Sequence, residues 1–152
     1  MKKIVNQHPA ERGQSLVELA LTITILMILL AGTIDLGRAF FTYMAMRDAA
    51  QEGAAYAAIC PAQTTDIRIR VLESAPDLIG QNLQASDIDV CVAGMEHASC
   101  GASPEIGAYV KVELDYNHRV ITPFIGAIIG TQTIPLHASA WNRILQTTCQ
   151  AG

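Results

Sequence analysis

The chain has 152 residues, of which 51% are hydrophobic, 16% charged and 5% aromatic, and its formal net charge is −4. This length leaves room for one modest domain, and the mean hydropathy of +0.29 is higher than a soluble fold needs, which indicates a membrane segment. The acidic balance and the lack of a Lys or Arg cluster argue against a nucleic-acid partner.

Residues 1–13 have the composition of a cytoplasmic leader. They carry Lys2, Lys3 and Arg12 against the single acid Glu11, and Pro9 disfavours a helix. The rest of the chain is net acidic, so the basic end is the extreme N-terminus. We predict an unstructured leader rather than part of a folded core.

Residues 14–36 are predicted to form a transmembrane helix. Residues 19–34 contain no charged side chain, and a helix from Leu16 to Leu36 would be about 30 Å long, enough to cross a bilayer. Because the positive charges precede this run, the positive-inside rule places residues 1–13 in the cytoplasm and the chain after about residue 36 outside.

The helix is expected to continue outside the membrane over residues 37–60, which contain no proline. Small residues recur there at every fourth position and form a ridge that allows close approach of another backbone. The members of this ridge are Ala45, Ala49, Gly53 and Ala57. We favour packing against the protein's own sheet, while packing against neighbouring helices in an assembly remains the alternative.

Two charges follow the apolar run directly. Asp35 and Arg38 are three residues apart, so they can meet on one face of a helix at the membrane interface. We expect an ordinary interfacial ion pair, which stabilises the fold by about a few tenths of a kcal/mol.

Residues 61–152 are predicted to form an extracytoplasmic α+β domain. Cys60-Pro61 ends the long helix, and Thr64, Thr65 and Asp66 offer N-cap oxygens for a second helix that runs to about residue 72 or 78. Alternating apolar residues predict three strands, at 86–92, 109–116 and 134–140. The apolar segment 122–130 is expected to form a short helix under the sheet edge or, less favoured, a contact with lipid or a partner. The expected fold is a long helix packed on a small antiparallel sheet.

All four cysteines follow the apolar run, as expected for disulfides in an exported segment. Three pairings are possible, and we favour Cys91 with Cys100 and Cys60 with Cys149. A zinc site built from Cys91, His97 and Cys100 is disfavoured because it lacks the paired short spacings of structural zinc sites. No metal or other cofactor is expected.

Glu18 is the unusual residue of the apolar helix. A carboxylate at this depth is unfavourable unless it is paired, protonated or near the interface. If a peptidase cut after Gly13, a new α-amino group would appear on Gln14, one helical turn from Glu18 or within reach of Glu18 in a neighbouring subunit. The simpler alternative is that Glu18 reaches the lipid headgroups at the helix N-terminus.

The order of a basic leader, Gly13, four residues, Glu18 and an apolar helix resembles the class III signal peptide of type IV prepilins and pseudopilins. More narrowly, residues 12–58 resemble the TadE-like family of minor pseudopilins of tight-adherence (Flp-type) pili. The residues that carry the resemblance are Gly13, Glu18, Asp35, Gly37, Arg38 and Ala49–Ala54. Residues 121–126 resemble such proteins less specifically. Gln14 in place of an aromatic residue, and Leu19 in place of tyrosine, favour a minor component over a major pilin.

The resemblance implies a pseudopilin-like fold, cleavage after Gly13 by a membrane prepilin peptidase, and a role in assembling, initiating or capping a surface pilus. It also implies partners among other pilins and pilus-assembly membrane proteins, and it allows methylation of the new amine. A filament subunit, a membrane assembly factor and a tip cap all fit this description.

We do not expect an enzyme, because no catalytic motif appears and His97, His118 and His137 stand isolated. A secreted module with a signal peptide cut near Ala31 or Gly32 is disfavoured by the apolar length and the continuing helix. The main alternative is an uncleaved single-pass membrane anchor with an extracytoplasmic partner-binding domain.

Overall fold

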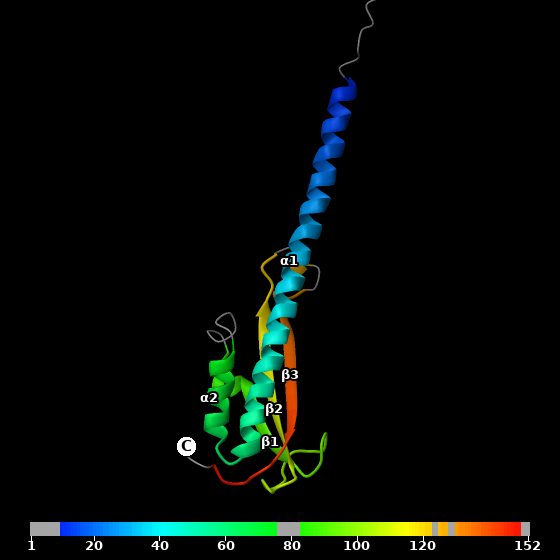
Figure 1. Ribbon diagram of the computed structural model, residues 1–152. Helices are drawn as coiled ribbons and strands as arrows, with labels where there is room; N and C mark the ends of the chain where they lie inside the picture. Colours follow the sequence, from blue (N-terminus) through cyan, green and yellow to red (C-terminus); the bar gives the residue numbers. More distant parts are fainter. Residues whose placement is uncertain (1–9, 76–82, 123–124, 128–129, 150–152) are drawn as a thin grey trace, which may run out of the picture.

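The computed structural model describes residues 10–75, 83–122, 125–127 and 130–149. Its elements, in chain order, are α1 (Ala10–Ile59), α2 (Thr64–Ser74), the single turn η1 (Ala85–Asp87), β1 (Ile88–Ala93), β2 (Tyr109–Arg119) and β3 (Thr133–Arg143). A long N-terminal helix packs on a three-stranded antiparallel sheet (Figure 1), which confirms the predicted α+β fold.

Helix α1 has 50 residues and is therefore about 75 Å long. It begins at Ala10, within the segment predicted to be an unstructured leader, and ends at Ile59, directly before Cys60-Pro61. Pro61 explains the end, because the residue before a proline is disfavoured in a helix. The N-terminal half of α1 projects away from the sheet, and the second half lies along it (Figure 1).

The sheet has the order β1-β2-β3, and both neighbouring pairs are antiparallel. Val112 is paired with Val90 on one side and with Ala140 on the other, so β2 is the central strand. The predicted strands are present, but β2 runs on to Arg119 and β3 to Arg143. The extra pairs at the end of β2 include Asn117 with Pro135, so this stretch lacked the apolar alternation on which the prediction depended.

The core lies between the second half of α1, helix α2 and one face of the sheet. Ala49 and Ala57 are fully buried, Ala45 is half-buried, and Gly53 is buried where α1 meets α2. A Cβ on Gly53 would lie 2.3 Å from Cγ2 of Val71. The ridge of small residues therefore packs within the protein's own domain, the arrangement that the sequence favoured.

A second row of small residues on α1 was missed by the sequence interpretation. Ala50, Ala54 and Ala58 are also buried, again four residues apart. With the first row they give α1 an apolar face wide enough to touch α2, β2 and β3 together.

Helix α2 differs from expectation at its start. It begins at Thr64 with Gln63 as the cap residue, and no side-chain oxygen caps it, so the predicted caps from Thr64, Thr65 and Asp66 were wrong. The hydroxyls and the carboxylate lie inside the first turn instead of before it. The helix ends at Ser74, within the predicted range, and an extension to residue 78 lies outside the described residues.

Two disulfides join Cys60 to Cys149 and Cys91 to Cys100, with Cα–Cα distances of 4.8 Å and 5.5 Å. These are the pairings that the sequence favoured. The first ties the tail to the end of α1, where Leu145 N–H also donates to the carbonyl of Ala58 at 2.8 Å. The second uses the two sulfur atoms of the disfavoured zinc site, which are therefore not available as thiolate ligands.

Candidate membrane anchor and assembly surface

The N-terminal half of α1 is an uncovered apolar rod. Its best 18-residue window has a mean hydropathy of 2.3, and none of that window is buried within the protein. Large apolar side chains point outward all round the helix, from Leu16 (67% exposed) to Leu36 (72% exposed). Such a helix is long and apolar enough to cross a membrane.

The threonines of this half satisfy their own hydroxyl groups. Thr22, Thr24 and Thr33 each donate to the carbonyl oxygen four residues earlier, at 2.8–2.9 Å. These bonds leave no hydroxyl proton of the three without an acceptor, which suits an environment that lacks water.

The three residues predicted to act in processing and assembly lie at the free end of α1. Gly13, Gln14 and Glu18 are all exposed, and they belong to the N-terminal end of α1, which projects away from the sheet (Figure 1). Among the described residues, the Glu18 carboxylate forms no ion pair. Nothing in the described part of the chain therefore offsets its charge.

Asp35 lies where the connection between β2 and β3 reaches α1. Its carboxylate accepts the backbone N–H of Ile121 at 3.3 Å and of Thr122 at 2.8 Å, and its side chain is buried. The expected ion pair with Arg38 is not formed in the described structure; Arg38 is exposed. The ion pair does not form because two backbone N–H groups hold the buried Asp35 carboxylate toward the domain, while the longer Arg38 side chain reaches water.

The same connection also touches α1 one turn earlier. Residues 125–127 are helical, and a Cβ built on Gly32 would lie 3.7 Å from Cδ1 of Ile125. The predicted short helix over 122–130 is thus seen in part, and residues 123, 124, 128 and 129 lie outside the described residues. This segment packs beside α1 rather than under the sheet edge alone.

His118, at the end of β2, faces the same part of α1. It is buried, its Nδ1 lies 3.3 Å from the hydroxyl of Thr42, and its Nε2 has no partner among the described residues. Burial lowers the pKa of His118 from its ordinary value, nearby Arg38 lowers this pKa further, and Asp35 opposes both effects. The lowered pKa favours the neutral form of the imidazole.

Sequence reasoning missed the contacts of Asp35 and His118 with distant parts of the chain. The signals were present, since Asp35 is the first charge after the apolar run and residues 120–136 carry no charged side chain. Two uncharged stretches that far apart in sequence suggest a common apolar environment.

On the side of α1 away from the sheet, apolar residues stay exposed beyond Asp35. Phe40 and Phe41 are 59% and 73% exposed. The exposed apolar surface of the N-terminal half therefore continues along α1 past Asp35, on a side that the buried ridge of small residues does not occupy.

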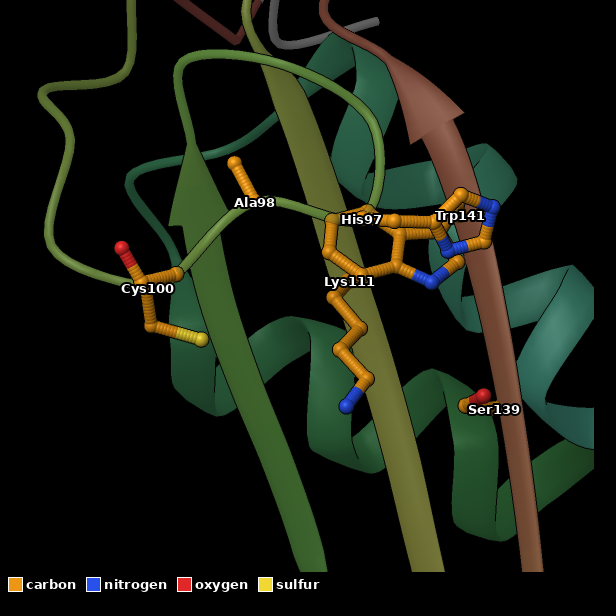
Figure 2. A pocket seen from close by; sticks show the side chains of 7 residues that line it. His97, Ala98, Cys100, Lys111, Ser139 and Trp141 are labelled. Atoms are coloured by element: carbon orange, nitrogen blue, oxygen red, sulfur yellow. The ribbon is translucent and has the colours of Figure 1, made fainter.

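A shallow hollow lies at the opposite end of the domain, on the outer face of the sheet (Figure 2). It measures about 580 Å³ and is lined by His97, Ala98, Ser99, Cys100, Lys111, Ser139 and Trp141. The ammonium of Lys111 is paired with Glu113 and lies 5.8 Å from the centre of the Trp141 ring. The charged group is thus already engaged, and the cysteine is oxidised, so the hollow presents neither a free thiolate nor an unpaired amine.

No group of three His, Cys, Asp or Glu side chains that could hold a metal occurs among the described residues. In a comparison with known protein families, residues 13–55 match the model described as TadE-like protein. The predicted resemblance to that family is thereby confirmed over this segment. Neither the curated proteins nor the solved structures gave a match.

Proposed function

We propose that this protein is a minor pseudopilin that is cut after Gly13 by a prepilin peptidase and then acts in assembling a tight-adherence, type IV-like pilus. The observation that carries the proposal is the match to TadE-like proteins over residues 13–55. That match begins at the glycine that precedes the proposed cut. The role is structural and requires no cofactor.

The proposal divides the chain into four parts. Residues 1–13 are the cytoplasmic leader, 14–36 the transmembrane helix, 37–60 its extracytoplasmic continuation and 61–152 the extracytoplasmic domain. The basic residues before the apolar run favour this orientation, and the two disulfides suit an oxidising compartment outside the cytoplasm. The expected location is the cell membrane, with access to the cell surface.

The partners follow from the uncovered helix. The peptidase would act at Gly13 and Gln14, which are exposed. Other pilins, pilus-assembly membrane proteins and lipid would then surround the apolar part of α1, whose large side chains from Leu16 to Leu30 are exposed. In that setting Glu18 would pair with the new amine of Gln14, in the same chain or in a neighbour.

One observation favours the second candidate, an uncleaved membrane anchor with a partner-binding domain. Helix α1 begins at Ala10 and passes through Gly13 without interruption, so the proposed cleavage site is helical in the full chain. A peptidase would have to unwind this turn before it could cut. The two candidates differ in whether residues 1–13 persist.

The deciding experiment is mass spectrometry of the mature chain, expressed with and without a prepilin peptidase. We expect the chain to begin at Gln14 only when the peptidase is present, and Gly13→Leu to block this cut. Gly37→Leu is the matched control, since a Cβ at either glycine meets nothing within 4 Å. Retention of residues 1–13 with active peptidase would favour the uncleaved anchor, and a start near Thr33 would exclude both candidates.

A further inference from the structure

We propose that the described residues of the connection between β2 and β3 (120–122, 125–127 and 130–132) form a second membrane contact that rests in the bilayer leaflet on the side of the domain. This inference rests on the proposed membrane anchor, because it assigns the connection a depth relative to the helix that crosses the bilayer. The partner is the lipid itself. The described part of the connection comprises residues 120–122, 125–127 and 130–132.

The connection meets α1 at the level of the apolar run. Asp35 holds Ile121 and Thr122 by two hydrogen bonds at the end of the apolar run. Ile125 then lies against Gly32, which belongs to the uncharged stretch 19–34. Because each helical residue rises 1.5 Å, Ile125 sits about 4.5 Å deeper than Asp35 along the membrane-spanning helix.

The connection is also uncharged. Residues 120–132, which join the two strands, carry no charged side chain, although polar residues usually prevail in such loops. Ile121 is 64% exposed. An uncharged connection with exposed isoleucine, placed beside a transmembrane helix, is continuous with the apolar surface of that helix and fits the same lipid.

Several backbone N–H groups of the connection also have partners inside the protein. Irregular backbone enters a bilayer only when its polar groups find partners inside the protein. Asp35 accepts the N–H groups of Ile121 and Thr122, and four further N–H groups of the connection bind carbonyl oxygens at 2.9–3.4 Å. The N–H of Val120 donates to the carbonyl of Gln132, those of Ile125 and Gly126 donate to the carbonyl of Thr122, and that of Gly130 donates to the carbonyl of Gly126.

The burial of the Asp35 carboxylate and the burial of the two backbone N–H groups depend on each other. The backbone N–H groups stabilise the buried carboxylate of Asp35, and the carboxylate allows these N–H groups to leave water. This reciprocity gives a physical reason for an acid at position 35, where the neighbouring Ile34 and Leu36 are exposed apolar residues. Asp35 is thus a positioning residue for the membrane contact.

The test uses tryptophan fluorescence, because Trp141 is the only tryptophan and lies in the hollow far from the membrane helix. In a Trp141→Phe background of the full chain, single tryptophans replace Leu26, Ile121 or Leu145. Leu145 is the matched control, since its side chain is also 64% exposed but lies beside the far end of α1. The proteins are reconstituted in phosphatidylcholine and phosphatidylglycerol vesicles with brominated acyl chains.

We expect the bromines to quench the Leu26→Trp variant strongly and the Ile121→Trp variant at least half as much, with a blue-shifted emission, and to leave the Leu145→Trp variant unquenched. If the Ile121→Trp variant behaves like Leu145→Trp while Leu26→Trp is quenched, the second contact is wrong and the membrane anchor stands. If Leu26→Trp is not quenched either, the anchor and the proposed function both fail.

A second pair of variants tests Asp35 itself. Asp35→Ala removes the acceptor of both N–H groups, and we expect quenching of the Ile121→Trp variant to fall by at least half. Arg38→Ala removes a charge one turn away and should leave that quenching unchanged. Equal quenching in both variants would show that Asp35 does not position the connection. If the Ile121→Trp variant is quenched only before other pilins are added, this surface contacts protein in the assembly. That outcome would also contradict a stable lipid contact.

Discussion

His118 is the residue whose protonation we expect to affect stability most directly. Its imidazole is buried against Thr42, and burial and Arg38 lower its pKa below the ordinary value of 6.5 while Asp35 opposes them. Since the unfolded chain then binds a proton at a higher pH than the folded chain, the folded state loses stability as pH falls through about 6.5. The loss ends once the pH is below the folded pKa.

The corresponding measurement is the free energy of unfolding in detergent, taken from denaturant titrations at pH 8 and pH 5.5. We predict that the decrease between these two values is smaller in His118→Gln than in the unsubstituted chain, because glutamine keeps a polar group near Thr42 but does not titrate. Identical decreases in the two proteins would mean that His118 does not contribute to the pH dependence.

At this scale the sequence predicted the right residues but not always the right partners. Asp35 and Arg38 were expected to pair because they are neighbours on a helix, yet the partners of Asp35 are backbone groups 86 and 87 positions away. Local spacing cannot indicate a contact that exists only after the sheet has packed on α1. The favoured cysteine pairing is present, although the sequence allowed three pairings and cysteine positions alone do not determine which of them forms.

Gly53 lies where α1 approaches α2 closely, so a side chain at this position should disturb the contact between the two helices. Alanine in place of glycine favours a helix by about 1 kcal/mol, but its Cβ would lie 2.3 Å from Cγ2 of the fully buried Val71. Overpacking of this kind costs about 1–3 kcal/mol. We therefore expect Gly53→Ala to lower the free energy of unfolding by roughly 1–2 kcal/mol, measured by denaturant titration.

Two further variants separate packing from helix propensity. Gly37→Ala adds the same methyl group where nothing lies within 4 Å of it, so it should leave stability unchanged or raise it. Val71→Ala should be less harmful in the Gly53→Ala background than alone, because it removes the clash. If Gly53→Ala were as stable as Gly37→Ala, the approach of α1 to α2 would be looser than the structure has it.

The helices and strands were predicted well where a regular spacing of apolar residues determined them. The long helix followed from uninterrupted helix formers up to Cys60-Pro61, and the inward residues of all three strands followed from alternation. The end of β2 was missed because Asn117 and His118 are polar, although His118 is buried. Its burial depends on the facing side of α1, which no local pattern reveals. The N-cap of α2 failed for a related reason, since Thr64, Thr65 and Asp66 are all suitable and only the fold selects the first helical residue.

For the whole molecule, the structure separates two functions in space. The domain holds the second half of α1 rigidly through the core and a disulfide at its end, while the first half remains uncovered. An assembly that packs these uncovered helix halves together needs an interaction that sets the axial position of each helix relative to its neighbours. Glu18 is suited to that role, because it is an exposed carboxylate with no ion-pair partner among the described residues.

We predict that Glu18→Gln leaves cleavage and membrane insertion intact but lowers the yield of surface pili, and of pilins that copurify with this chain, by at least about tenfold. Two opposite charges 4 Å apart attract by roughly 4 kcal/mol at an effective dielectric constant of ~20, and a loss of 1.4 kcal/mol already corresponds to about a tenfold change. Asp48→Asn is the matched control, since it makes the same carboxylate-to-amide change at an exposed position of α1. Normal pilus yield in Glu18→Gln would mean that the carboxylate only reaches the headgroups, and that the register of the helices is set by apolar packing along residues 19–34.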